Sequence, residues 1–155
     1  MALVRCACSR VDWMLAMSEA ASFLQIAYAS RNLVPGEHMQ QEIESILALS
    51  RMRNATWGVT GALLFSADSF VQLLEGPEDA VETLFEKIQL DRRHADVVVL
   101  QASAVQDRGF AQWSMAYAGR HDDLRFADLC AARGDMASSA ILRLLQGAID
   151  RMPVT

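Results

Sequence analysis

The apolar and polar positions along this chain repeat in two different ways, and each predicts a different kind of element. Short apolar runs bounded by turn residues indicate strands, whereas apolar residues three and four positions apart indicate helices. Strands are predicted at 23–28, 57–65, 70–75, 97–105 and 112–118. Helices are predicted at 37–52, at 77–91, from Asp122 or Asp123 through Arg133, and from Ser138 or Ser139 onward. This order predicts an α+β fold, a ferredoxin-like βαββαββ sheet with two C-terminal helices.

The predicted strands are apolar on both of their alternating faces. Val71 and Leu73 point one way along their strand, while Phe70 and Leu74 point the other way. A sheet with one face in water would alternate apolar and polar residues instead. We therefore expect the two middle helices on one face of the sheet and the two C-terminal helices on the other. In the last helix, Ile141, Leu145, Ala148 and Met152 are the predicted buried residues.

One amide interrupts the second strand of a predicted hairpin whose turn is at 66–69. Gln72 points to the same side as Phe70 and Leu74. An amide has two donor hydrogens and an acceptor oxygen, and burying it without partners costs about 1–3 kcal/mol. Two partners are open at this point: the polar edge of a ligand, or another side chain such as a tyrosine hydroxyl.

Composition and charge exclude several classes of protein. With 155 residues, 52% apolar and 21% charged, the chain is predicted to be one folded domain rather than a disordered segment. Its net charge of −5 argues against a general nucleic-acid binder, which carries a basic face. No apolar run approaches the roughly 18 residues that span a bilayer, so no membrane partner is expected.

The three cysteines bear on compartment and on metal binding. Cys6, Cys8 and Cys130 form an odd number in a chain without a credible secretion signal, so reduced thiols and a cytoplasmic location are predicted. The spacing of Cys6 and Cys8 and the lack of further ligands argue against a zinc site. No metal site is expected.

The chain is predicted to divide into three segments. Residues 1–22 are an N-terminal extension, 23–118 the main domain and 119–155 a C-terminal helical cap. Within the first segment, 1–16 is interpreted as an upstream extension or a flexible arm, and a packing helix that aids self-association is the less favoured alternative. No linker and no second domain are recognised, so no attached effector is expected.

Several segments, in the right order, resemble the BLUF family of blue-light sensors that use flavin. They are 26–30, Asn54, 58–65, 70–76 and 88–94, and 110–115 is similar to the family's fifth strand. The resemblance covers about 23–118, and the short length with C-terminal helices resembles the stand-alone members. It implies a non-covalently bound FAD, with FMN as the alternative, and a sensor rather than an enzyme.

The resemblance also implies roles for individual residues around the flavin. Tyr28 would give an electron and a proton to the excited flavin, and Gln72 would lie between Tyr28 and the N5/C4=O edge. Asn54 would hydrogen-bond the isoalloxazine edge, with Arg53 beside it. Some relatives carry histidine where this chain has Arg53.

Further implied residues lie at the other end of the flavin and around its ring. Arg93 and His94 would be at the ribityl and phosphate end, with Asp91 nearby. The resemblance implies that Phe70 and Ser50 contact the cofactor. It also implies that Trp113 and Met115 are photoactive neighbours, and that the arrangement of Ser50, Trp113 and Met115 differs between the dark and light states.

Each of these residues also has an ordinary structural interpretation. Tyr28, Trp113 and Met115 are of types common in cores, and a buried amide such as Gln72 can fix a sheet edge. Asn54 could end the helix after Met52. Basic residues at 92–94 suit the negative end of a helix.

Three functions are compared. The leading one is a flavin photosensor that acts through a downstream protein partner and self-association. An RNA-binding module shares the βαββαβ order but needs exposed aromatic side chains and a basic face, neither of which is evident. A small flavin enzyme would need a substrate base, and none is recognised.

Overall fold

The computed structural model describes residues 22–131 and 135–150. Its elements are β1 (Phe23–Asn32), a short 3-10 helix η1 (Gly36–His38), α2 (Met39–Trp57), β2 (Thr60–Phe65), β3 (Ser69–Gly76), α3 (Glu78–Gln89), β4 (His94–Val105), β5 (Ala116–Arg120), α4 (Phe126–Ala131) and α5 (Asp135–Ile149). The expectations for 1–16 fall outside the described residues. No helix in the described ranges is both long and apolar enough to cross a membrane.

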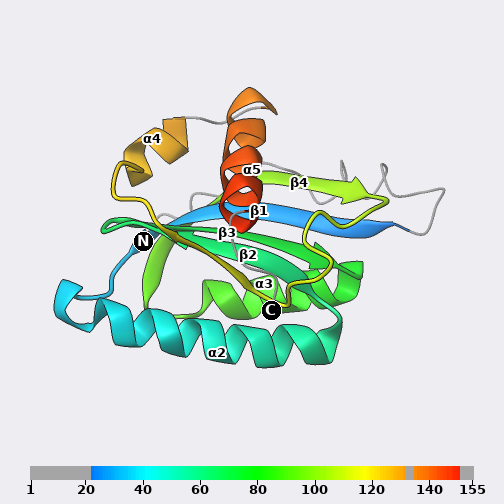
Figure 1. The fold of residues 1–155 in the computed structure, drawn as a ribbon, viewed down its shortest axis with the longest axis horizontal. Helices are drawn as coiled ribbons and strands as arrows, with labels where there is room; N and C mark the ends of the chain where they lie inside the picture. The colour runs from blue at the N-terminus through cyan, green and yellow to red at the C-terminus, as the bar shows by residue number, and fades with distance from the viewer. Residues whose placement is uncertain (1–21, 132–134, 151–155) are drawn as a thin grey trace.

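The strands form a single sheet in the order β4-β1-β3-β2-β5 (Figure 1). Neighbouring strands are antiparallel except β2 and β5, which run parallel. The first four strands have the ferredoxin-like arrangement, and β5 extends the sheet beside β2. The predicted α+β fold class is confirmed.

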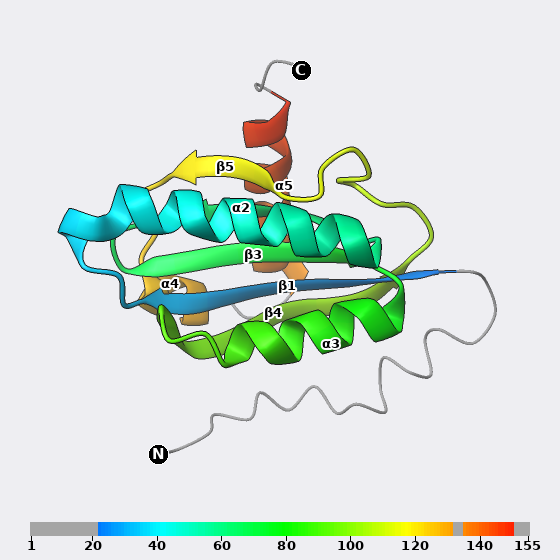
Figure 2. The ribbon, with the colours of Figure 1, turned by 90° about the horizontal axis from the view of Figure 1, so that it is seen from below.

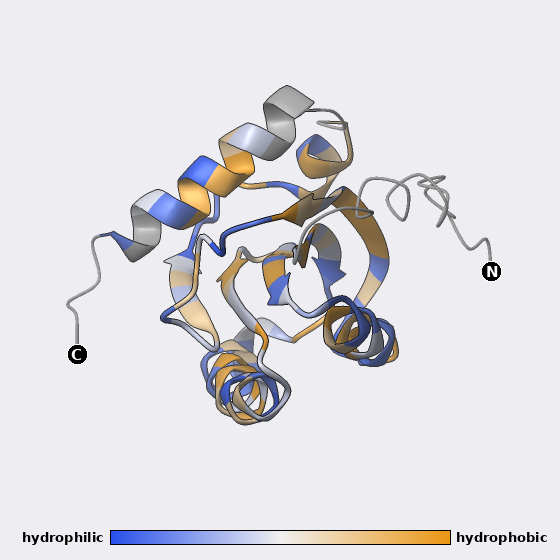
Figure 3. Ribbon diagram, turned by 90° about the vertical axis from the view of Figure 1, so that its right-hand side faces the viewer, coloured by the Kyte–Doolittle hydropathy of each residue, from blue (hydrophilic) through white to orange (hydrophobic). Residues whose placement is uncertain are grey.

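Helices cover both faces of this sheet. α2 and α3 lie side by side on one face, and α4 and α5 lie on the other (Figures 1 to 3). The side chains of β3 divide accordingly: Phe70 and Leu74 belong to the apolar core under α2 and α3, while Val71 and Leu73 belong to the core under α4 and α5. The prediction of two covered faces is confirmed.

The C-terminal helices fill the second core with a few large side chains. Leu129 of α4 and both Ile141 and Leu145 of α5 are buried in one apolar core with residues of β1, β2, β3 and β5. Burying one such side chain favours folding by about 1.5–3 kcal/mol. The predictions for Ala148 and Met152 fall outside what the structure describes.

The predicted end of the first helix at Met52 is wrong. α2 continues to Trp57, and Gly58 closes it in the left-handed conformation, with φ 67°. Glycine adopts this conformation without a Cβ clash, so it is a common helix terminator. Asn54 therefore lies inside the helix, which excludes its interpretation as the helix end.

The predicted fifth strand at 112–118 is wrong at its start, because β5 begins at Ala116. The preceding segment is a turn, in which the Trp113 N–H donates to the Phe110 carbonyl at 2.9 Å. The Trp113 carbonyl then accepts from the Gly61 N–H at 3.0 Å. Alternating apolar residues before β5 were thus a misleading strand signal.

The predicted start of the third helix at Asp122 or Asp123 is also wrong. α4 begins at Phe126, whose N–H donates to the carboxylate of Asp68 in the β2–β3 turn, at 3.2 and 3.3 Å. Asp122 instead accepts from the Ala67 N–H and pairs with Arg120. The helix start therefore depends on a residue distant in sequence.

Smaller corrections concern the remaining ends. β1 continues four positions past its predicted end to Asn32, and β4 begins at His94 rather than 97. β2 begins at Thr60 rather than 57, because α2 continues to Trp57, and α5 begins at Asp135 rather than Ser138 or Ser139. The ladder between β1 and β4 extends to the pair Asn32 and His94, which explains both longer strands. Arg133 and Gly134 lie outside the described residues.

Candidate functional site

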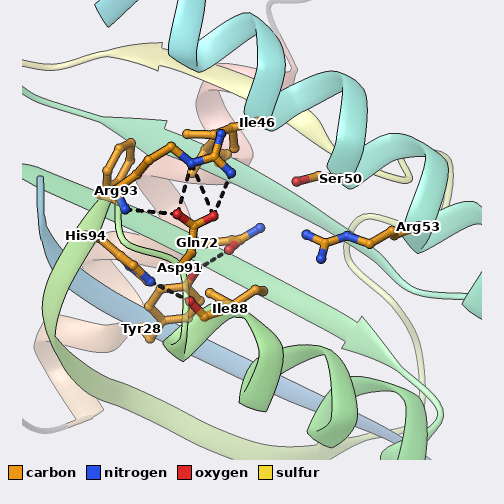
Figure 4. A pocket seen from close by; sticks show the side chains of 11 residues that line it. Tyr28, Ile46, Ser50, Arg53, Gln72, Ile88, Asp91, Arg93 and His94 are labelled. Carbon is orange, nitrogen blue, oxygen red and sulfur yellow. Dashed lines mark hydrogen bonds and ion pairs between the residues drawn. The ribbon is translucent and has the colours of Figure 1, made fainter. Parts of the chain in front are cut away.

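A pocket opens between α2 and α3, with β1, β2 and β3 as its floor (Figure 4). It contains about 470 Å³ of space free of protein atoms, with the open solvent at its mouth included. Its lining consists of Tyr28, Ile46, Ser50, Arg53, Leu63, Phe70, Gln72, Ile88, Asp91, Arg93 and His94.

The floor of the pocket carries a short chain of polar contacts. Tyr28 and Gln72 are paired residues on β1 and β3. The Tyr28 hydroxyl donates to Gln72 Oε1, and Gln72 Nε2 lies 3.7 Å from the sulfur of Met115. Of the two partners left open for the buried amide, the tyrosine hydroxyl is therefore present. Sulfur is a weak acceptor, so the Nε2 end of Gln72 is held less firmly than its oxygen.

The phenol of Tyr28 is held in its neutral form. Burial raises its pKa far above the ordinary value of 10.0, the negative charge of Asp91 raises it further, and the positive charge of Arg53 partly offsets both. Tyr28 therefore has no accessible phenolate in the ground state. Its proton can leave readily only if an electron is removed from the ring as well.

An ion-pair cluster stands at the mouth of the pocket. Arg93 Nη2 lies 2.6 Å from Asp91 Oδ2, and Arg93 Nη1 lies 3.4 Å from Glu42 Oε2 on α2. The hydrogen bonds from Arg93 hold the pKa of Asp91 below its ordinary value, and those to Asp91 raise the pKa of Arg93. The cluster is partly solvent-exposed and joins α2 to the segment between α3 and β4.

His94 closes the same end with both ring nitrogens engaged. Nε2 lies 2.6 Å from the Ile88 carbonyl, and Nδ1 lies 2.8 Å from the Ser30 hydroxyl. A carbonyl only accepts, so Nε2 carries a proton. The ring lies edge-on to Tyr28 and Phe70, and its orientation is fixed between β1 and α3.

Arg53 supplies an unsatisfied donor. Its Nε is buried and is the one such side-chain nitrogen or oxygen among the described residues without a hydrogen-bond partner. Figure 4 shows the guanidinium pointing from α2 toward Gln72 across the pocket. A buried donor without a partner costs about 1–3 kcal/mol. A ligand edge with carbonyl or ring-nitrogen acceptors would satisfy it, so the donors present fit the polar edge of a flavin ring.

The structure brings most of the predicted cofactor-binding residues together. Those that line the pocket are Tyr28, Ser50, Arg53, Phe70, Gln72, Asp91, Arg93 and His94. Asn54 is buried beside them but is absent from the lining, and its Nδ2 donates to the Ser114 carbonyl at 2.6 Å. The roles assigned to these residues stay predictions.

The two predicted photoactive neighbours lie on different sides of the sheet. Met115 packs in the core under α2 and α3 and touches Gln72. Trp113 is partly buried and packs against the core under α4 and α5. The segment between them therefore passes from one core to the other.

Sequence reasoning missed Glu42 and Leu63 as neighbours of the site. Glu42 lies on the helical face that also carries Ile46, Ser50 and Arg53. Positions 42, 46, 50 and 53 recur at helical spacing, so this face of α2 could have been recognised. Leu63 needed the register of β2 with β3, where it pairs with Gln72.

Comparison with known proteins identifies the family. The family described as BLUF, "Sensors of blue-light using FAD", matches residues 23–116. The chain is 40% identical over 78 residues to "Photoactivated adenylate cyclase subunit beta" of Euglena longa, covering 50% of this chain and 9% of that protein. It is 34% identical over 85 residues to "Blue light- and temperature-regulated antirepressor BluF" of Escherichia coli (strain K12), covering 55% and 21%.

Solved structures give the same result over more of the chain. "BlsA photo-activated state" superposes with a TM-score of 0.69 at 28% identity, covering 86% of this chain and 98% of that chain. "BlrB - a BLUF protein, dark state structure" has a TM-score of 0.64 at 28% identity, covering 83% and 95%.

The two curated relatives are longer than the part that this chain matches, which is at most about a fifth of either one. The match over 23–116, the sheet order and the likeness to solved BLUF structures agree, and the chain belongs to the BLUF family of flavin-based blue-light sensors.

Proposed function

We propose that this protein is a blue-light photoreceptor that binds FAD between α2 and α3 and stores the light signal in the contacts of Gln72. The observation that carries the proposal is a series of two side-chain contacts. The Tyr28 hydroxyl donates to Gln72 Oε1, and Gln72 Nε2 contacts the Met115 sulfur. This series lies on the floor of a pocket of about 470 Å³. Bound flavin would supply blue-light absorption and an electron acceptor.

Tyr28 and Gln72 would act as one unit. Because burial keeps Tyr28 protonated, its electron and proton must leave together or in close succession. The proton's nearest acceptor is Gln72 Oε1. If the amide gains this proton at oxygen, it could release one from nitrogen to an acceptor atom of the bound flavin, which would have received the electron; alternatively, the amide could rotate. Either change would exchange its donor and acceptor ends. The new arrangement would outlast the return of the electron.

The change would leave the pocket through the segment at 113–115. Its successive carbonyls are each held: Trp113 by the Gly61 N–H, Ser114 by Asn54, and Met115 by Arg51 Nε at 3.1 Å. Losing or gaining one hydrogen bond shifts an equilibrium by about 0.5–1.5 kcal/mol. Several of these contacts must therefore change together to move β5 and the C-terminal helices.

FAD is proposed over FMN from the description of the family. The family resemblance would place the phosphate of either flavin near Arg93 and His94 at one end of the pocket, where Arg93 already pairs with Asp91 and Glu42. One related structure is named "Klebsiella pneumoniae BlrP1 with FMN and cyclic diGMP, no metal ions". Chromatography of the flavin released by heat would identify the bound form.

We propose that the signal passes to a protein partner in the cytoplasm, with self-association as part of the response and without enzymatic activity of this chain. Both faces of the sheet are covered, and the large apolar side chains exposed among the described residues are Leu33, Leu49, Met52 and Leu90, none of them aromatic. This disfavours RNA binding through the sheet. Light scattering in darkness and in light tests self-association, and a monomer at high concentration in both would contradict it.

The visible spectrum tests the function directly. The purified protein should show the absorption of oxidised flavin, and blue light should shift it reversibly to longer wavelength. Heating should release the flavin, because no covalent bond is proposed. A colourless protein that takes up no added flavin would overturn the proposal, and so would flavin that stays attached to the unfolded chain.

A further inference from the structure

A buried carboxylate stands on the opposite side of the sheet from the pocket. Glu75 of β3 is 0% exposed. It lies three residues after Gln72 on the same strand, so its side chain points to the face covered by α4 and α5. A buried charge is costly unless hydrogen bonds compensate it, so its contacts indicate what it holds.

The Glu75 carboxylate accepts hydrogen bonds from one side chain and two backbone groups. Oε1 accepts from Gln25 Nε2 and from the Gly109 N–H, both at 2.9 Å, and Oε2 accepts from the Phe110 N–H at 3.0 Å. Gln25 is its neighbour on β1. The two backbone groups belong to the segment between β4 and β5. Glu75 therefore fastens that segment to the centre of the sheet.

The fastened residues lead directly to the pocket. The Phe110 carbonyl accepts from the Trp113 N–H, and Met115, two residues further on, touches Gln72. Gly109 also lies close to α5. A Cβ built at this position would be 3.7 Å from Oε1 of Gln146 in α5, and 3.4 Å from Glu75 Oε1. The segment at 109–115 thus connects Glu75, the pocket and α5.

Its two ends are held in different ways. At the pocket end, Arg51 and Asn54 of α2 hold the Met115 and Ser114 carbonyls. At the other end, Glu75 holds the N–H groups of Gly109 and Phe110. Both ends include a hydrogen bond to a charged group, but Arg51 is exposed and holds one carbonyl. The Glu75 carboxylate is fully buried and holds two backbone N–H groups, so the Glu75 end is the firmer anchor.

We propose that Glu75 is a positioning residue that sets how readily the segment at 109–115 rearranges, and thereby the lifetime of the light state. The proposal rests on the proposed photoreceptor function. A rearrangement of Met115 against Gln72 must move or strain a segment fixed at Gly109 and Phe110. Weakening that anchor lowers the barrier to return, so the light state should decay faster.

The test compares Glu75→Gln with wild type, using the full chain loaded with flavin. Glutamine has the same shape but replaces one acceptor oxygen with a donor that faces N–H groups. We expect an unchanged flavin absorption maximum in darkness, a normal red shift on illumination, and a return in darkness that is roughly tenfold faster. Amide hydrogen exchange at Gly109 and Phe110 should also accelerate in darkness.

Glu86→Gln is the matched control, because it makes the same chemical change on the exposed face of α3. It should keep the wild-type return rate. If Glu75→Gln fails to fold, Gln25→Leu replaces it, since this variant removes one donor and leaves both backbone contacts of Glu75. A smaller acceleration is expected for Gln25→Leu.

The outcomes separate the two claims. Wild-type protein that binds flavin but shows no red shift would refute the photoreceptor function itself. A normal wild-type red shift with a return rate in Glu75→Gln within about twofold of wild type would overturn the role of Glu75 alone. A lowered melting temperature with an unchanged return rate would likewise assign Glu75 a structural role only.

Discussion

The two faces of the sheet use the same strands in different ways. On the face under α4 and α5, Val71 and Leu73 of β3 pack into a filled apolar core. On the face under α2 and α3, Gln72 of the same strand meets Tyr28 beside an open pocket. Successive residues of one strand therefore serve stability on one side and chemistry on the other.

The difference lies in how polar groups are satisfied. Glu75, on the filled face, has firm donors on both carboxylate oxygens. On the pocket face, Arg53 Nε has no partner and Gln72 Nε2 has only a weak sulfur acceptor. Unsatisfied groups favour a ligand and permit rearrangement, whereas satisfied ones fix a single structure. Variants on the pocket face should consequently lose the light response, and variants on the filled face should lose stability.

The largest effect is expected from Gln72→Leu on the pocket face. Leucine has a similar size but neither end of the amide, so the protein should fold, bind flavin and lose the red-shifted state. The measurement is the absorption spectrum before and after blue light. Gln89→Leu, which removes an exposed amide of α3, should keep the full shift.

Combining Gln72→Leu with Tyr28→Phe sharpens this prediction. The two side chains are joined by a hydrogen bond, so their effects should not add. A normal red shift in flavin-loaded Gln72→Leu would remove Gln72 from the mechanism.

Leu73→Ala tests the filled face. Leu73 is 0% exposed, and truncating a buried leucine lowers the free energy of unfolding by about 2–5 kcal/mol. Denaturant unfolding of the flavin-loaded protein measures this loss. The remaining folded protein should keep the wild-type red shift. Loss of the shift without loss of stability would break the proposed division between the faces.

Met115→Leu should have a smaller, kinetic effect. The change conserves volume, so its cost in stability should stay below about 1.5 kcal/mol. Gln72 Nε2 loses its sulfur contact, and the return to the dark state should change by about two- to threefold. Met52→Leu is the control, because Met52 is 63% exposed. Equal kinetics in both variants would exclude a role for the sulfur.

The smallest effect concerns acid. The pKa of Asp91 is held below its ordinary value of 3.8 by hydrogen bonds from Arg93. Its contribution to stability is therefore present above pH 3.8 and declines as the pH falls through the lower, folded-state pKa. Because the pair is partly exposed, we expect less than about 1 kcal/mol.

The matching variant for the acid prediction is Asp91→Asn. The difference in unfolding free energy between wild type and this variant should shrink below pH 3.8. A difference that grows as the pH falls would contradict the assigned direction.

Local patterns predicted the fold and much of the pocket lining. Strand alternation placed Gln72 beside Phe70 and Leu74, and the family resemblance selected Tyr28, Arg93 and His94, which the structure brings to one pocket. These predictions succeeded in placement because they depend on short-range periodicity and on motifs.

Features that depend on distant contacts were missed. The start of α4 is set by Asp68 of a turn far earlier in the chain, and β5 starts late because Gly61 and Phe110 hold Trp113 in a turn. The anchoring role of Glu75 needed the register of β3 and the path of the β4–β5 segment. None of these contacts leaves a periodic signal in the sequence.

The most direct test of the central claim is the light-induced spectrum of Tyr28→Phe compared with wild type. Phenylalanine keeps the aromatic ring, whose centroid lies 5.3 Å from that of Phe85. It removes the hydroxyl that donates a hydrogen bond to Gln72 Oε1. With flavin bound to both proteins, blue light should shift the wild-type absorption reversibly to longer wavelength and leave the variant unshifted. A full red shift with wild-type yield in Tyr28→Phe would contradict the account.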